Sequence, residues 1–128
     1  WIRLKVAWIA CATVFTANNL DIRAVAALTQ SGKTVLLMSR MHTNVPIYAM
    51  SSVVETRRRV TLFRGVYPVK FEGARDPERA LHLAEDELLA RGVVQRGDYI
   101  VLTIGEPMGK AGGTNTMKIV KVGEHRRA

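Results

Sequence analysis

The stretch IRAVAALTQSGKTVLLMSRMH, residues 22–42, decides the fold class. Its apolar start predicts a short buried strand at 22–28, and TQSG after it predicts a turn. Residues 32–42 then have the spacing of a helix, which we expect Ser31 to cap. A strand, a tight turn and a helix in this order are typical of proteins in which the two kinds of element alternate around a parallel sheet.

The rest of the chain continues this alternation. Asp76 followed by Pro77 predicts a helix start, and Ser52 with Glu55 has the spacing of a capping box. The last two strands are joined without a helix, so we expect them to pair antiparallel at one edge. The predicted class is therefore α/β, a three-layer sandwich with helices on both faces of a five-stranded, mostly parallel sheet whose last strand is antiparallel. Helices are expected at 4–20, 52–64 and 77–91, and the other strands at 46–51, 66–71, 98–105 and 114–122.

Length and composition bound the class of protein. The chain has 128 residues, of which 48% are hydrophobic, which predicts one folded domain spanning 1–128. It begins at Trp1 rather than Met, and we interpret it as a fragment of a longer chain. The single Cys11 excludes an internal disulfide, and we expect it to be packed inside its helix. No apolar stretch approaches the about 20 residues that a membrane span needs.

The charge balance favours anionic partners. Lys and Arg number 19 against 11 Asp and Glu, a net charge of +8. Such a balance is typical of proteins that bind nucleic acid, an anionic membrane or small phosphorylated ligands, although 6% aromatic residues disfavour a base-stacking surface. We interpret the run Arg57-Arg58-Arg59 as a solvated helix face paired with Glu55.

The Gly32-Lys33-Thr34 element lies where phosphate cradles lie, between a strand and a helix N-terminus. Free backbone N–H groups and the positive charge of Lys33 would attract an anion there. Three interpretations stay open: a single-phosphate cradle, an ordinary capped helix start, or a nucleotide hydrolase. The hydrolase is disfavoured because Ala27 replaces the first glycine of the nucleotide-binding loop pattern, and because no strand ends in an Asp that could hold Mg²⁺.

A second candidate is the glycine-rich loop GEPMGKAGGTNT, residues 105–116. It is either a ligand loop at the carboxyl end of a strand or an ordinary flexible hairpin. No catalytic triad, carboxylate pair or metal-ligand spacing is present, so we expect no catalytic residue and no metal site. Glu85 and Asp86 are expected on the exposed face of their helix.

Four motifs in order now resemble the C-terminal domain of pyruvate kinase: LTQSGKT, VPI, FRGVYPV and TNT. The resemblance implies a domain that binds a phosphorylated allosteric effector and forms part of a homotetramer interface in a cytoplasmic glycolytic enzyme. It also implies that catalysis lies elsewhere. Phosphoryl transfer from phosphoenolpyruvate to ADP, with its Mg²⁺ and K⁺, would belong to a barrel domain absent here, against which the first helix is our candidate to pack.

The resemblance also assigns residues. The turn that holds the effector phosphate matches Thr29, Gln30, Ser31, Gly32, Lys33 and Thr34, and the effector loop matches Lys110, Gly112, Gly113 and Thr114. The Trp-Arg-Pro of members activated by fructose 1,6-bisphosphate is absent, since the chain has Gly105-Glu106-Pro107. The arginine that would hold a second phosphate has no clear match, although Arg79 is near.

These departures favour a sugar phosphate or nucleoside monophosphate, such as AMP, ribose 5-phosphate or glucose 6-phosphate. Some members of the family bind no effector at this turn, so the absence of an effector also stays open. Two further alternatives are a basic nucleic-acid-binding module and a free-standing phosphohydrolase that uses the Gly-Lys-Thr turn.

Overall fold

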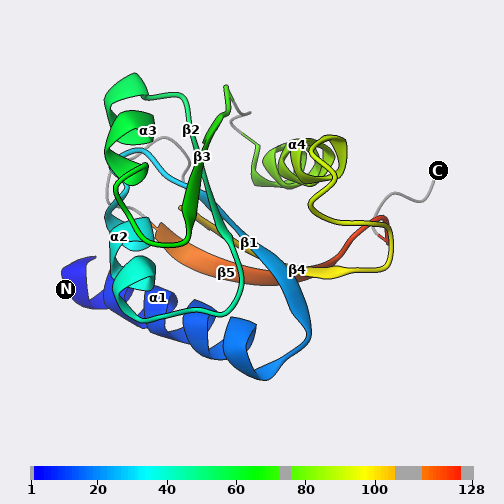
Figure 1. Ribbon diagram of the computed structural model, residues 1–128, viewed down its shortest axis with the longest axis horizontal. Coiled ribbons are helices and arrows are strands. Elements are labelled where there is room, and N and C mark those ends of the chain that lie inside the picture. The colour runs from blue at the N-terminus through cyan, green and yellow to red at the C-terminus, as the bar shows by residue number, and fades with distance from the viewer. Residues whose placement is uncertain (1, 73–75, 106–113, 125–128) are drawn as a thin grey trace.

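The structure is a computed structural model that describes residues 2–72, 76–105 and 114–124. Among the described residues, helices and strands alternate along the chain, as the sequence predicts, and β5 is the next described element after β4 (Figure 1). The elements are α1 (Ile2–Asn19), β1 (Ile22–Leu28), α2 (Lys33–Arg40), β2 (Ile47–Ser51), α3 (Val54–Val60), β3 (Val66–Lys70), α4 (Pro77–Ala90), β4 (Tyr99–Gly105) and β5 (Thr114–Lys121).

The strands form one sheet in the order β3-β2-β1-β4-β5. Strand β1 is central and pairs parallel with β2 on one side and with β4 on the other. Strand β3 extends the parallel part at one edge, and β5 pairs antiparallel with β4 at the other edge. The predicted five-stranded, mostly parallel sheet with an antiparallel last strand is therefore confirmed.

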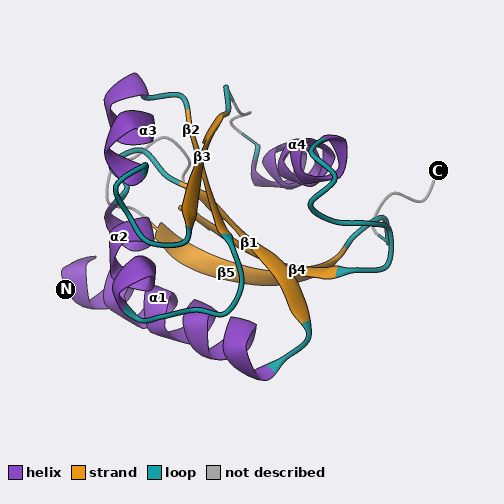
Figure 2. Cartoon of the chain, viewed as in Figure 1, coloured by secondary structure: helices purple, strands orange, loops and turns teal. Residues whose placement is uncertain are grey.

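Helices cover both faces of the sheet, which confirms the three layers (Figure 2). Helix α4 packs on one face, and α1, α2 and α3 pack on the other. Side chains along β1 alternate between the two cores: Ala24, Ala26 and Leu28 face α4, whereas Val25 and Ala27 face the three-helix side. The sheet is thus buried on both faces, as parallel sheets almost always are.

Two predicted helix starts differ from the structure. Helix α2 has Gly32 rather than Ser31 at its N-cap position, with a left-handed φ of 82°. Helix α3 begins at Val54 with Val53 at the N-cap and without the capping box of Ser52 and Glu55, and it ends at Val60. The local reason is that the Ser51 hydroxyl accepts a hydrogen bond from the Val53 N–H at 3.1 Å, so the chain already turns before the predicted cap.

The predicted start of α4 is confirmed. Asp76 occupies its N-cap position and accepts a hydrogen bond from the Glu78 N–H at 3.2 Å, and Pro77 follows as the first helical residue. In the described part of the chain, no helix is long and apolar enough to cross a membrane.

Two predictions of side-chain exposure are wrong. Glu85 is fully buried rather than exposed, because its Oε1 accepts a hydrogen bond from the Gly123 N–H at 3.1 Å, just beyond β5; Asp86 is exposed as expected. Cys11 is exposed rather than packed. It lies on the outer side of α1, as do Trp8 and Phe15, whose exposed fractions are 70% and 69%.

The α4 face of the core depends on Leu88, which is fully buried. Truncation to Ala should leave a cavity that the packed helix and sheet cannot refill, and we expect the free energy of unfolding to fall by about 2–5 kcal/mol. Urea unfolding followed by circular dichroism would measure it. Leu62→Ala, at a side chain that is 85% exposed, is the matched control and should change stability by less than about 0.5 kcal/mol. Equal effects of the two substitutions would contradict the assigned core.

Candidate anion-binding site

The predicted phosphate turn lies at the carboxyl end of β1, directly before α2. The chain leaves β1 toward β2 on one side, whereas β4 lies on the other side of β1. This reversal is the position at which open α/β sheets bind ligands, outside the carboxyl ends of the strands. Residues 29–34 are therefore held at the edge of the sheet that favours a ligand.

Hydroxyl groups satisfy two N–H groups of this turn. Thr29 Oγ1 accepts a hydrogen bond from the Gly32 N–H at 2.8 Å, and Ser31 Oγ accepts one from the Lys33 N–H at 3.3 Å. The expectation that these backbone N–H groups are free is therefore wrong. Lys33 is exposed at the surface of the turn, whereas Thr34 is buried.

Side chains of helix α3 contact the turn and hold its backbone in place. Thr56 Oγ1 donates a hydrogen bond to the Gln30 carbonyl at 2.5 Å, and Arg59 Nη1 donates one to the Ser31 carbonyl at 2.8 Å. A Cβ atom at position 32 would lie 3.4 Å from both Thr56 Cγ2 and Val60 Cγ1. The conformation of the turn is thus fixed by a helix that follows it by about two dozen residues.

The interpretation of the arginine run as a solvated face holds for Arg58 and Arg59, which are exposed, and is wrong for Arg57, which is half-buried. Arg57 Nη1 donates to the Ser51 carbonyl at 2.8 Å, and Arg59 binds the turn; Arg58 is exposed. The ion pairs found among residues 2–72, 76–105 and 114–124 include neither these arginines nor Glu55.

Sequence reasoning therefore missed Thr56 and Arg59 as parts of the site. Their spacing, with Val60, marks one helix face at i, i+3 and i+4. That signal shows only that the three side chains point the same way, and nothing local shows that this face meets the turn.

The second predicted element cannot be placed with it. Lys110, Gly112 and Gly113 lie outside the described residues. Thr114 is the first residue of β5 and pairs with Gly105, so both ends of this loop lie at the carboxyl end of β4. Within the described ranges, no group of three or more His, Cys, Asp and Glu side chains could hold a metal ion.

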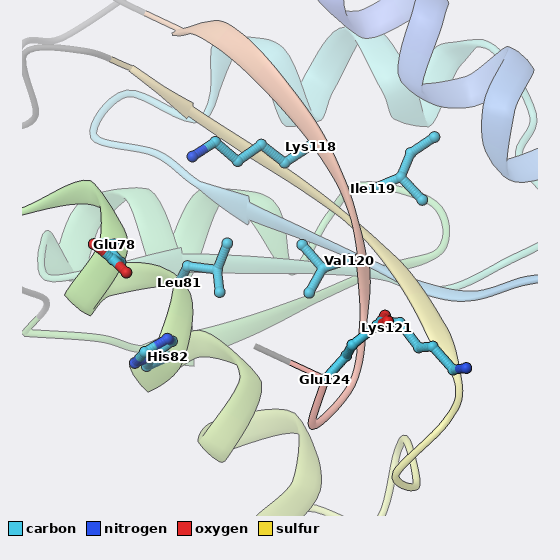
Figure 3. A pocket seen from close by; sticks show the side chains of 8 residues that line it. All are labelled: Glu78, Leu81, His82, Lys118, Ile119, Val120, Lys121 and Glu124. Carbon is cyan, nitrogen blue, oxygen red and sulfur yellow. The ribbon is translucent and has the colours of Figure 1, made fainter. Parts of the chain in front are cut away.

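A shallow groove between α4 and β5 was not predicted (Figure 3). Leu81 and Val120 point toward each other at its base, and Lys118 extends from β5 beside them (Figure 3). The charged lining is mixed in sign, so it favours neither an anion nor a cation. The lining residues are Glu78, Leu81, His82, Lys118, Ile119, Val120, Lys121 and Glu124.

Sequence comparison with known families decides the assignment. Residues 7–120 match the family described as pyruvate kinase, alpha/beta domain. The chain belongs to this family. The resemblance found in the sequence motifs is thereby confirmed, and the fold is that of the C-terminal domain of pyruvate kinase, a glycolytic phosphotransferase family.

Bacterial pyruvate kinases are similar to the chain over most of its length. It is 40% identical to pyruvate kinase of Buchnera aphidicola subsp. Acyrthosiphon pisum and 38% identical to pyruvate kinase II of Salmonella typhimurium, in each case over 89% of the chain. It is 36% identical to pyruvate kinase of Geobacillus stearothermophilus over 81% of the chain. The matched region spans only 24%, 24% and 18% of these relatives, and the catalytic domain of a pyruvate kinase is not in this chain.

The turn of this pyruvate kinase domain requires glycine at position 32. We expect Gly32→Ala to reduce the free energy of unfolding by about 1–2 kcal/mol, because a side chain disfavours the left-handed conformation. Gly65→Ala is the matched control, since Gly65 has a φ of 72° and a Cβ atom there would meet nothing within 4 Å. Thermal unfolding should show similar losses for both, whereas only Gly32→Ala should shift the NMR signals of Thr29 and Ser31. Unchanged signals would contradict the described turn.

Proposed function

We propose that this chain is a regulatory and assembly domain of a longer pyruvate kinase, a single domain spanning 1–128, and that it binds a phosphorylated effector at residues 29–34. The observation that carries the proposal is the turn itself: a strand end, a left-handed Gly32, the exposed cation of Lys33 and the start of α2 lie together in a member of this family. A helix start with a lysine at its first residue favours an anion.

The hydroxyl groups give the turn a way to exchange partners. In the structure, Thr29 and Ser31 accept hydrogen bonds from the Gly32 and Lys33 N–H groups. A bound phosphate oxygen is a stronger acceptor for these N–H groups, and the released hydroxyls can then donate to the same phosphate. Without ligand, the N–H groups of the turn are thus hydrogen-bonded to its own hydroxyl groups. With ligand, they would be hydrogen-bonded to the phosphate.

We infer that the ligand is a sugar phosphate or nucleoside monophosphate, and that the loop containing Lys110, Gly112, Gly113 and Thr114 contacts it. The support is that the loop joins β4 to β5 at the carboxyl end of β4, beside the strand that carries the turn. The Mg²⁺ and K⁺ of the parent enzyme, and its transfer of phosphoryl from phosphoenolpyruvate to ADP in the cytoplasm, would belong to the part of the enzyme outside these residues.

A titration of the 128-residue chain tests the effector proposal. We expect one of AMP, ribose 5-phosphate, glucose 6-phosphate or fructose 1,6-bisphosphate to raise the midpoint of thermal unfolding, by an amount that corresponds to about 2.7 kcal/mol at a hundred times the Kd. Lys33→Ala should remove this rise. Lys121→Ala is the matched control, because Lys121 pairs with Tyr99 at the opposite end of the sheet.

No rise with any of these ligands would argue against the effector proposal. A short DNA duplex belongs in the same experiment. If only the duplex raised the midpoint, with an effect that fell steeply with salt, the chain would be a nucleic-acid-binding module instead.

We propose in addition that the outer side of α1 takes part in self-association of the parent enzyme, which we expect to be a homotetramer; the packing of α1 against the barrel domain is the alternative. Its outer side exposes Leu4, Trp8 and Phe15, at 54%, 70% and 69%. These positions are spaced by four and seven residues, so they form one stripe along the helix. Exposed apolar stripes of this kind mark sites of protein association.

Sedimentation equilibrium tests the self-association. We expect the chain to dimerise with rising concentration, and the double substitution Trp8→Gln and Phe15→Gln to raise the dimer Kd by about a hundredfold or more, since two buried aromatic anchors dominate such contacts. Leu62→Gln, at a comparably exposed leucine after α3, should leave the Kd unchanged. A chain that stays monomeric at all concentrations would assign the stripe to the absent barrel domain instead.

A further inference from the structure

Arg59 lies outside the sequence motif that defines the turn, yet its guanidinium group is attached to it. Arg59 Nη1 donates to the Ser31 carbonyl at 2.8 Å, and the side chain is otherwise exposed. Thr56 and Val60 of the same helix face are buried beneath Gly32. The head of Arg59 is therefore held at the surface of the turn, next to the residue that precedes Gly32 and Lys33.

The charge of Arg59 is not neutralised by this contact. A backbone carbonyl accepts one of the five N–H groups of a guanidinium and carries no net charge. Glu55 lies four residues earlier on α3, but among the described residues no ion pair joins a carboxylate to Arg59. A fixed arginine that keeps both its charge and most of its donors is suited to a second anionic acceptor.

Arg58 provides an internal comparison. It carries the same charge on the same helix, and its side chain is exposed. General attraction by the basic surface would involve Arg58 and Arg59 equally. Only Arg59 is oriented by the turn, so an effect confined to Arg59 would be a property of the site.

We propose that Arg59 is a second cationic binding residue of the phosphate turn and that, with Lys33, it selects doubly charged phosphomonoesters over singly charged anions. This inference rests on the proposed effector function. Two cations and the start of α2 match the charge of about −2 that a phosphomonoester carries at neutral pH. The planar fork of the guanidinium can bind two oxygens of one phosphate, which a lysine cannot do.

The test uses NMR titrations of the 128-residue chain at about pH 7.5, well above the second phosphate pKa of about 6, with methyl phosphate, which is doubly charged, and dimethyl phosphate, which carries one charge. The readout is the shift of the Gly32 and Lys33 amide signals. We expect the wild-type chain to bind methyl phosphate about tenfold or more tightly than dimethyl phosphate, a factor that one charge-assisted contact supplies.

Three variants separate the possible roles of Arg59. Arg59→Gln should weaken methyl phosphate binding by about tenfold and leave dimethyl phosphate binding within about twofold, so that the discrimination is lost. Arg59→Lys should restore part of it, because the charge returns without the fork. Arg58→Gln removes the same charge and should change neither Kd by more than about twofold.

Each contrary result has a distinct meaning. Equal effects of Arg58→Gln and Arg59→Gln, or equal weakening of both esters by Arg59→Gln, would overturn the inference; the second result would reduce Arg59 to a support of the turn. If the wild-type chain binds methyl phosphate and Lys33→Ala prevents binding, the proposed function stands whatever Arg59 does. If the turn signals of the wild-type chain do not respond to methyl phosphate, the proposed function and this inference fall together.

Discussion

The parallel pairing of β1 on both of its edges is the constraint on which the rest of the structure depends. The strand is flanked by β2 and β4, and of its seven residues only Arg23 is exposed. A strand that is buried on both faces and paired on both edges needs helices above and below it. It also delivers the chain to one place, the carboxyl edge of the sheet, where residues 29–34 turn into α2.

The sequence predicts the elements whose signals are local. Alternation of apolar runs with helical spacing placed the nine elements of the described ranges, and Asp76 before Pro77 marked the start of α4 because capping needs only neighbouring residues. The family motifs placed the candidate turn for the same reason, since the residues of each motif lie close together in the chain. These parts could be predicted because the residues that decide them are adjacent.

The errors arise where a neighbouring residue competes for a cap and where a distant segment supplies a hydrogen-bond partner. Ser52 and Glu55 have the letters of a capping box, but the chain leaving β2 turns earlier through Ser51. The sequence predicts that Glu85 is exposed, because it is a charged residue on a surface helix. The segment after β5 supplies an N–H donor that allows its burial. The expected pairing of the α3 arginines with Glu55 is wrong for the same reason, because Arg57 and Arg59 donate to carbonyl groups of β2 and of the turn rather than to a carboxylate.

The support of the turn by α3 has a consequence for how the site comes into being. The bonds from Thr56 to Gln30 and from Arg59 to Ser31 join residues 26 and 28 positions apart. Closing such a long loop costs entropy that the packing of α3 offsets, so the shape of the turn depends on the docked helix. A synthetic peptide with the sequence of residues 22–42 would contain the motif but would lack the contacts with α3 that hold its conformation. The feature most easily recognised in the sequence is thus a property of the whole folded chain.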